Sequence, residues 1–201
     1  MALHYEDGQV QITKVVVGPM VNNVFVVRCR GTGTSVLVDA ADEPEVLLPL
    51  CEELDVGDVL TTHGHRDHIQ AVPAVRAAGH RVGVAQGDAE LLPAYDFEIA
   101  DGDVIEVGDL RLHAVHTPGH TPGSTCFTIE GSPVLLSGDT LFPGGPGNTR
   151  RNPTHFATII RSIQQRLFTL PDETIVMPGH GDDTTIGTER PHLQEWIDRG
   201  W

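Results

Sequence analysis

Four side chains that commonly bind metals lie within one short segment of the sequence. Residues 61–68 read TTHGHRDH, which places His63, His65, Asp67 and His68 close together along the chain. Neutral imidazole and carboxylate groups are good ligands for zinc and for similar divalent metals. A single metal rarely takes four ligands from so short a segment, whereas two neighbouring metals can share them. The segment therefore predicts a metal site, with a pair of adjacent ions as the arrangement that uses all four side chains.

Three later segments combine glycine or proline with further ligand-type residues. They read HTPGHTPGS at residues 116–124, SGDTLF at residues 137–142 and MPGHG at residues 177–181. Small residues let the backbone turn sharply and bring a side chain close to a metal. These segments therefore supply additional candidate ligands from distant parts of the chain.

Three of the candidate ligands follow closely after apolar segments typical of β-strands. These segments are residues 59–62, 134–137 and 174–177. Strand ends hold the following loops rigidly and gather distant residues at one edge of a sheet, where ligand sites commonly lie. We therefore expect strands to position the candidate ligands.

Helical patterns occur between the predicted strands. Residues 43–54 and 152–168 carry apolar residues at helical spacing. Asn152 can cap the second helix and Pro153 can open it. Strands and helices together predict a mixed α/β protein.

The composition argues against several functional classes. The chain has 201 residues, which suits one domain over residues 1–201. The formal net charge is −15, which argues against a broad phosphate-binding surface, so we expect no nucleic-acid partner. No apolar run approaches the length of about 18 residues that a membrane span needs, so we expect no membrane association.

The beginning of the sequence and its cysteines favour a cytoplasmic protein. The first residues lack the basic and apolar regions of a signal peptide. Cys29, Cys51 and Cys126 are widely spaced and form no Cys-x-x-Cys pair. We expect buried free thiols, which are typical of a reducing compartment.

The ordered series of motifs resembles that of the metallo-β-lactamase superfamily of metallohydrolases. His-x-His-x-Asp-His is followed by Pro-Gly-His-Thr, Gly-Asp-Thr and Pro-Gly-His-Gly, and the likeness extends over residues 15–195. Within the superfamily, the chain is most similar to short glyoxalase II-type proteins, which are hydroxyacylglutathione hydrolase-like. The resemblance implies an α/β fold in four layers, an αβ/βα sandwich in which two mixed β-sheets pack face to face and helices cover the outer faces.

The resemblance also implies how the ligands divide between two metals. Three histidines would hold the first metal, an aspartate and two histidines would hold the second, and another aspartate would bridge the pair. The first set is His63, His65 and His120, the second set is Asp67, His68 and His180, and the bridge is Asp139. We expect two divalent ions, with zinc as the expected metal and iron or manganese as alternatives, because this donor set accepts all three.

The implied reaction is the hydrolysis of a small thioester. A hydroxide that bridges the two metals would attack the carbonyl carbon, while one metal polarises the carbonyl oxygen and the other helps the thiolate to depart. Asp67 would also orient the hydroxide, which makes it the expected catalytic residue in addition to a ligand. No serine or cysteine nucleophile is needed.

The chain departs from glyoxalase II in the parts that recognise substrate. The sequence ends soon after His180, so we expect no counterpart of the C-terminal helical domain that contributes to glutathione binding. The Gly-Arg pair that follows the bridging aspartate in the family is replaced by FPGGPGNTRR at residues 142–151. Both departures argue against glutathione as the thiol.

Several further residues are candidates for supporting roles. Arg66, Arg150 and Arg151 could anchor a carboxylate of a small-molecule substrate, because arginine binds carboxylates through two parallel hydrogen bonds. Asp39 is expected to hold the ligand loops by hydrogen bonds, beyond the direct metal ligands. His116 is expected to have a similar supporting or purely structural role.

Two alternative activities use the same motifs. A persulfide dioxygenase with one iron would use a subset of the ligands, such as His63, His65, His120 and Asp139, and would leave the other metal position empty. A lactone or β-lactam hydrolase would use the complete metal pair. The second set of ligands is present in full, which favours hydrolysis. The sequence gives no indication of the oligomeric state.

Overall fold

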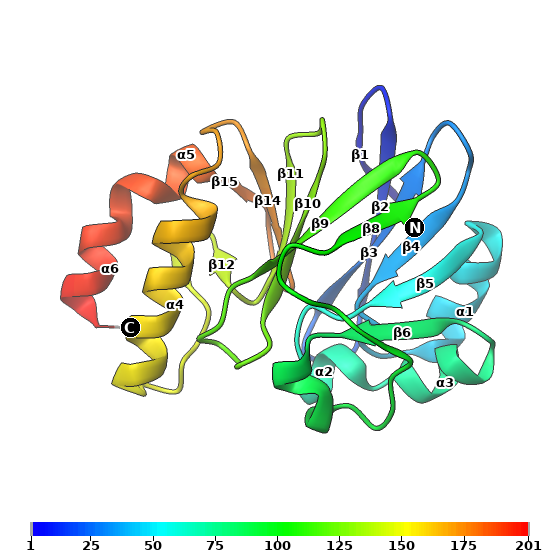
Figure 1. Cartoon of the computed structure of the whole chain (residues 1–201), viewed down its shortest axis with the longest axis horizontal. Helices are drawn as coiled ribbons and strands as arrows, with labels where there is room; N and C mark the ends of the chain where they lie inside the picture. Colours follow the sequence, from blue (N-terminus) through cyan, green and yellow to red (C-terminus); the bar gives the residue numbers. More distant parts are fainter. Residues whose placement is uncertain (1, 201) are drawn as a thin grey trace.

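Two β-sheets lie face to face in the computed structural model, which describes residues 2–200 (Figure 1). The first sheet contains, in spatial order, β1 (Ala2–Glu6), β2 (Val10–Val17), β3 (Asn22–Cys29), β4 (Ser35–Val38), β5 (Val56–Leu60), β6 (Arg81–Val84) and β7 (Phe97–Glu98). The second contains β15 (Thr184–Thr185), β14 (Ile175–Pro178), β11 (Val134–Gly138), β10 (Thr125–Ile129), β9 (Leu110–His116) and β8 (Val104–Val107). A short antiparallel pair, β12 (Leu141–Phe142) and β13 (Gly145–Pro146), forms a separate two-stranded sheet next to β14.

Both sheets are mixed. In the first, β1 to β4 pair antiparallel, whereas β4, β5, β6 and β7 pair parallel. In the second, β11 and β14 are parallel and the remaining pairs are antiparallel. The parallel pairs matter for function, because their carboxyl ends lie at the same edge of a sheet.

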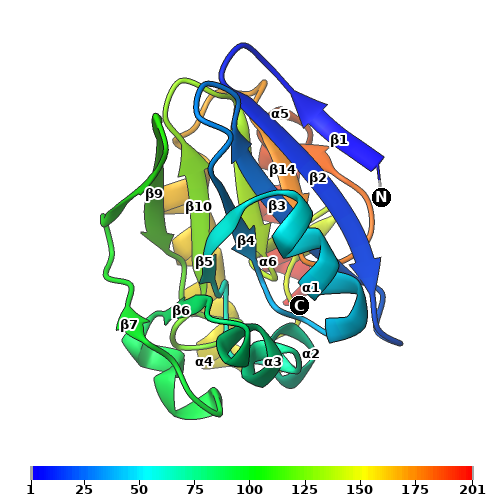
Figure 2. The same cartoon turned by 90° about the vertical axis from the view of Figure 1, so that its right-hand side faces the viewer.

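Helices cover the outer face of each sheet. They are α1 (Pro44–Glu53), α2 (Arg66–Ile69), α3 (Val72–Ala77), α4 (Pro153–Ser162), α5 (Ile186–Glu189), α6 (Leu193–Arg199), the 3₁₀ turns η1 (Gln86–Leu91) and η3 (Arg190–His192), and the π-helical turn η2 (Ile163–Leu167). Figure 1 shows α4 and α6 on one side of the molecule and α1 and α3 on the other, and Figure 2 shows α1 and α3 in front of the first sheet. Within residues 2–200, every helix is too short or too polar to span a membrane.

The alternation of side chains along β3 explains the layers. Phe25 and Val27 point into the apolar core between the two sheets, whereas Val24 and Val26 pack in the core beneath α1 and α3. A third apolar core joins the second sheet to α4 and α6. Because successive strand residues point to opposite faces, one strand contributes to two cores. The expected four-layer α/β sandwich with two mixed sheets is confirmed.

Two expected elements end differently in the structure. The helix expected over residues 152–168 is α-helical only to Ser162 and continues as η2, where Phe168 N–H donates to the Ile163 carbonyl at 2.8 Å. That bond spans five residues and defines a π-helical turn. The strand expected over residues 59–62 ends at Leu60, because the Thr62 N–H donates to the Asp39 side chain. The expected cap is confirmed, since Asn152 Oδ1 accepts from two backbone N–H groups of the first helical turn.

Candidate metal centre

The expected ligands come from loops of both sheets. The segment that contains His63 and Asp67 follows β5 of the first sheet. His120 lies in the loop between β9 and β10, Asp139 follows β11, and His180 follows β14, all in the second sheet. Seven expected ligand residues form three overlapping groups in which the ligand atoms lie within 4.8 Å of one another.

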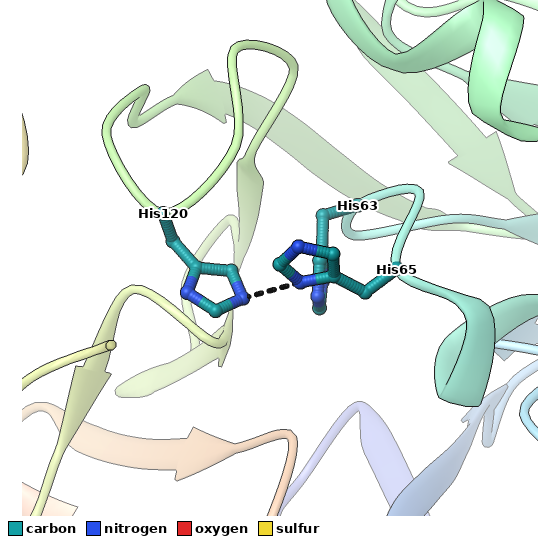
Figure 3. Close-up of side chains that lie close together, drawn as sticks. All are labelled: His63, His65 and His120. Carbon is teal, nitrogen blue, oxygen red and sulfur yellow. Dashed lines mark hydrogen bonds between the residues drawn. The ribbon is translucent and has the colours of Figure 1, made fainter. Parts of the chain in front are cut away.

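The first group brings together His63, His65 and His120 (Figure 3). His65 Nδ1 lies 2.8 Å from His120 Nε2. His120 Nδ1 donates to the carbonyl oxygen of Asn148 at 2.9 Å. Because a carbonyl only accepts, this bond places the ring proton on Nδ1 and leaves the Nε2 lone pair directed at the group.

The second group brings together Asp67, His68 and His180. His180 Nε2 lies 3.2 Å from His68 Nε2 and 3.3 Å from Asp67 Oδ2. The other nitrogen of His180, Nδ1, donates to the carbonyl oxygen of Met20 at 3.0 Å. As in the first group, a backbone carbonyl fixes the ring so that Nε2 faces its neighbours.

Asp139 lies between the two groups. Its Oδ1 is 3.5 Å from His68 Nε2, and its Oδ2 is 3.5 Å from His120 Nε2 and 3.6 Å from His180 Nε2. One carboxylate therefore reaches histidines of both groups, which is the placement that a bridging ligand requires.

Unpartnered polar atoms in the centre fit a bound cation. His63 Nε2 and Asp139 Oδ1 are buried and have no hydrogen-bond partner among the described residues. Leaving such an atom unpaired costs about 1–3 kcal/mol, and coordination to a cation would remove that cost for both. Gly179 keeps this space open, since a Cβ there would collide with Asp139 Oδ1 and lie 2.7 Å from His68 Cε1. The residues present thus fit a divalent metal centre.

Electrostatics keep the first group neutral. Burial of the ring, together with the charge of His68, holds the pKa of His63 well below its ordinary value. Burial and the neighbouring His65 lower the pKa of His120 to about 4. Both rings are therefore neutral at pH 7, which is the form that binds a metal.

His68 behaves in the opposite way in the metal-free protein. Burial alone would lower its pKa, but the hydrogen bond and charge of Asp39, with the charge of Asp139, raise the pKa to about 9. Burial likewise raises the pKa of Asp139. Burial would also raise the pKa of Asp67, yet the hydrogen bond from Asn22 Nδ2 and the charge of His68 lower it. In the metal-free protein the second group thus contains a protonated His68 beside an ionised Asp67.

Asp39 connects the first sheet to the ligand segment. Its carboxylate accepts hydrogen bonds from Thr62 N–H at 2.7 Å, from Thr62 Oγ1 at 2.8 Å and from His68 Nδ1 at 2.8 Å. These contacts orient the His68 ring with Nε2 toward Asp139. His116 lies outside all three ligand groups, where its Nε2 donates to the Ile99 carbonyl at 3.2 Å.

The three candidate anchoring arginines occupy two different places. Arg150 and Arg151 follow Asn148, whose carbonyl holds His120, and both have left-handed backbone with φ of 52° and 55°. The charge of Arg150 reaches His65, because it helps burial to lower the pKa of that histidine. Arg66 instead lines a separate cavity beside α2 and α3.

Sequence reasoning missed two polar residues that shape the centre. Asn22, at the start of β3, is buried and donates to Asp67 Oδ2 at 2.9 Å. Asp88, in η1, is fully buried and accepts hydrogen bonds from the loops around His65 and His120. The pair of asparagines opening an apolar strand was a usable signal for Asn22. Asp88 had no comparable signal, since its partners are remote in sequence.

Comparison with known proteins identifies related chains. The sequence model described as "Metallo-beta-lactamase superfamily" matches residues 17–180. An Aquifex aeolicus protein described as uncharacterized is 34% identical, covering 89% of this chain and 94% of the relative. Hydroxyacylglutathione hydrolase of Cereibacter sphaeroides is 35% identical over 79% of this chain, and the chain spans only 62% of that relative. Hydroxyacylglutathione hydrolase GloC of Haemophilus influenzae is 32% identical, covering 77% of this chain and 83% of the relative.

Solved structures have the same arrangement of layers. The B3 metallo-beta-lactamase BLEG-1 has a TM-score of 0.80 at 28% identity, covering 90% of this chain and 97% of that one. The protein TTHA1623, solved in a di-iron-bound form, has a TM-score of 0.76 at 31% identity, covering 89% and 96%.

Proposed function

Because the chain belongs to the metallo-β-lactamase superfamily of metal-dependent hydrolases, we propose that it hydrolyses a small thioester at a centre of two divalent metal ions. The main support for this proposal is that two complete sets of ligands lie beside one carboxylate, that of Asp139. The set of three histidines and the set of one aspartate and two histidines both adjoin Asp139.

The ligands divide between two ions in this proposal. His63, His65 and His120 would hold the first ion, Asp67, His68 and His180 would hold the second, and Asp139 lies close enough to both sets to serve both ions. When bound, such a pair lowers the pKa of water and stabilises negative charge that develops on a carbonyl oxygen. Asp67, whose charged form is favoured by Asn22 and His68, would accept a hydrogen bond from the attacking water and so orient it.

The loop beyond Asp139 suggests a substrate with a negative charge. Arg151 lines a cavity of about 380 Å³ together with Pro146, Gly147, Asn148 and Thr149. Asn148 also holds His120 through its carbonyl oxygen, so the cavity adjoins the first ligand group. Arg150 and Arg151 would bind a carboxylate of the substrate and so place its thioester near the ligands.

The strained backbone of these arginines supports a binding role. Arg150 and Arg151 both occupy the left-handed region, at φ of 52° and 55°. Such conformations each cost about 1–3 kcal/mol and cluster at ligand-binding sites. The Arg150 N–H donates to Asn148 Oδ1 at 2.7 Å, which helps the loop to keep this form.

The relatives named hydroxyacylglutathione hydrolase support the thioester. They support the proposal only for the part of the sequence that they share with this chain, since the Cereibacter sphaeroides relative is considerably longer. We expect zinc in both positions, and the di-iron form of TTHA1623 makes iron the first alternative to test.

We further propose a small-molecule substrate rather than nucleic acid or membrane, and a cytoplasmic site of action. A net charge of −15 disfavours polyanionic partners. Cys29, Cys51 and Cys126 are free buried thiols, which suits a reducing compartment.

A substrate panel tests the proposal. Zinc-loaded protein would be assayed against a thioester bearing a carboxylate, its neutral methyl ester, a lactone and a β-lactam. We expect the carboxylate-bearing thioester to give the highest kcat/KM. A preference for the lactone or the β-lactam would refute the thioester assignment.

An oxygen electrode separates the proposal from a persulfide dioxygenase. Iron-loaded protein would be mixed with a glutathione persulfide. We expect no oxygen uptake above the rate without protein. Uptake that depends on one iron per chain would overturn the hydrolase proposal, because it would leave the second ligand group without a role.

A further inference from the structure

A buried carboxylate joins the two loops that carry the first ligand group. Asp88 lies in η1 and is fully buried. Its Oδ2 accepts from Gly64 N–H at 2.7 Å and from Thr121 Oγ1 at 2.6 Å, and its Oδ1 accepts from Gly123 N–H at 2.7 Å. None of these contacts involves a ligand side chain. Asp88 therefore acts by fixing the positions of the two loops.

The donors belong to loops of different sheets. Gly64 is the residue between His63 and His65, in the segment that follows the first sheet. Thr121 directly follows His120, in the loop of the second sheet. A single carboxylate therefore fixes the distance between the two parts of the first ligand group, which meet at 2.8 Å between His65 and His120.

Close packing leaves these loops little freedom. A Cβ on Gly64 would lie 2.7 Å from Leu91 Cβ and 3.2 Å from Asp88 Cβ. A Cβ on Gly123 would lie 2.7 Å from Asp88 Cγ. Glycine at both positions lets the backbone approach the carboxylate, so that its N–H groups reach the oxygens directly.

The charge of Asp88 complements a cation in the centre. All three hydrogen bonds to Asp88 come from uncharged donors. A buried charge is costly unless an opposite charge lies nearby. Asp88 accepts from the N–H of Gly64, the residue directly before His65, so a cation bound by His65 would lie near this carboxylate.

We propose that Asp88 is the positioning residue of the first metal site, which it forms by holding the His63–His65 loop against the His120 loop. This inference rests on the proposed pair of metal ions. Asp39 offers a comparison within the same molecule, because it holds His68 of the second group by a direct hydrogen bond. The two carboxylates should therefore affect different metal sites.

The test is a site-resolved zinc titration of the metal-free protein. Histidine rings labelled with ¹⁵N would report each site separately, with His65 and His120 for the first and His68 and His180 for the second. Asp88→Asn keeps the shape but removes the charge and places an amide N–H₂ against existing donors. We expect its first-site affinity to fall about 10–100-fold, the range for residues that orient metal ligands, and its second-site affinity to change less than about twofold, because the Asp39 contacts remain.

Two further variants complete the design. Thr121→Val removes one hydrogen bond to Asp88 and leaves the charge in place, so it should weaken the first site by a smaller factor. Asp58→Asn is the matched control, since Asp58 pairs with Arg81 at the surface, and it should change neither site. Saturating zinc should restore the wild-type His120 resonances in Asp88→Asn, which a collapsed site would not allow.

The outcomes separate this inference from the proposed function. Equal weakening of both sites in Asp88→Asn, or no change in either, would overturn the role of Asp88 while leaving the proposed function intact. Wild-type protein that binds fewer than two zinc ions would overturn the proposed function and this inference together.

Discussion

Individual histidines in the centre are oriented by acceptors on their far sides. His120 donates to the carbonyl of Asn148, His180 donates to the carbonyl of Met20, and His68 donates to Asp39. Each acceptor fixes which ring nitrogen carries the proton, and the other nitrogen then faces the shared space. A metal would therefore meet rings that are already aligned, and its binding would displace the second ring proton that the raised pKa keeps on His68.

Removal of a ligand should have a different effect from removal of a surface histidine. His65→Ala should reduce bound zinc from two ions per chain to one and lower the rate of thioester hydrolysis by more than about 100-fold, the upper end for changes next to a metal ligand. His192, which is exposed and contacts Glu195, provides the control, and His192→Ala should alter neither quantity. Metal analysis measures the bound zinc, and a thiol-release assay measures the rate of hydrolysis. Equal metal content in the two variants would refute the ligand assignment.

His68 should titrate at a much higher pH than an ordinary histidine. In metal-free protein its pKa should lie near the value of about 9, whereas that of His120 should lie near about 4. The raised pKa means that His68 stabilises the metal-free fold below pH about 6.5, the ordinary value, and that this contribution is lost as the pH rises through 9. NMR titration of the His68 and His120 ring resonances measures both pKa values.

Asp39→Asn tests the cause of that shift. The variant keeps the side-chain shape and removes the charge that raises the pKa of His68. The pKa of His68 should therefore fall, while that of His120 should stay low because burial sets it. An unchanged His68 pKa would show that Asp39 does not hold the ring in solution.

At the level of secondary structure, the loop after β11 would combine metal ligation with substrate contact. It runs from Asp139 past β12 and β13 to Asn152, which caps α4. Gly147 lets the loop fold back on the bridging aspartate, since a Cβ there would collide with the Asp139 carbonyl and approach His120 Nδ1 at 3.3 Å. The loop therefore has a fixed route, and Arg150 and Arg151 are presented from it.

Substitution of these arginines should affect substrate binding more than turnover. Arg150→Ala and Arg151→Ala should each raise KM for a carboxylate-bearing thioester about tenfold or more, because a hydrogen bond to a charged group contributes about 1.5–3 kcal/mol. The value of kcat should change little, since neither residue is a ligand. Arg111 lies on β9 and pairs with Glu130, which follows β10, and it supplies the control variant. A fall in kcat with KM unchanged would contradict the anchoring role.

The sequence predicted elements well where a local pattern defines them. The strands before His63, Asp139 and His180 follow from apolar runs, and the cap at Asn152 follows from its position before Pro153. Segments without periodicity were missed, including β1 and η1. The role of Asp88 could not be predicted, because its partners lie 24 to 35 positions away and only the folded chain brings them together.

At the scale of the whole molecule, the metal centre joins the two sheets. His63, His65, Asp67 and His68 belong to the first sheet's connections, and their partners His120, Asp139 and His180 belong to the second sheet's. The apolar core between the sheets holds the same halves together from within. Bound metal would therefore act as a cross-link at the open edge of the sandwich.

Metal removal should lower the stability of the entire fold. A ligand that binds only the folded state stabilises it by about 4 kcal/mol at a concentration 1,000 times its Kd. Chelation should therefore lower Tm, and stepwise return of free zinc should raise it with the logarithm of concentration. Thermal unfolding followed by circular dichroism measures the effect. His65→Ala should show a smaller shift, because it retains only the second group, and an identical shift would contradict the cross-linking role.

The central claim is hydrolysis of a thioester by a pair of metals, and thiol release during zinc titration of the metal-free protein tests it most directly. The rate for a carboxylate-bearing thioester should rise until two zinc ions are bound per chain, with one thiol and one acid formed per substrate. A rate that reaches its maximum at one ion, or that stays at the level of His65→Ala throughout, would contradict the claim.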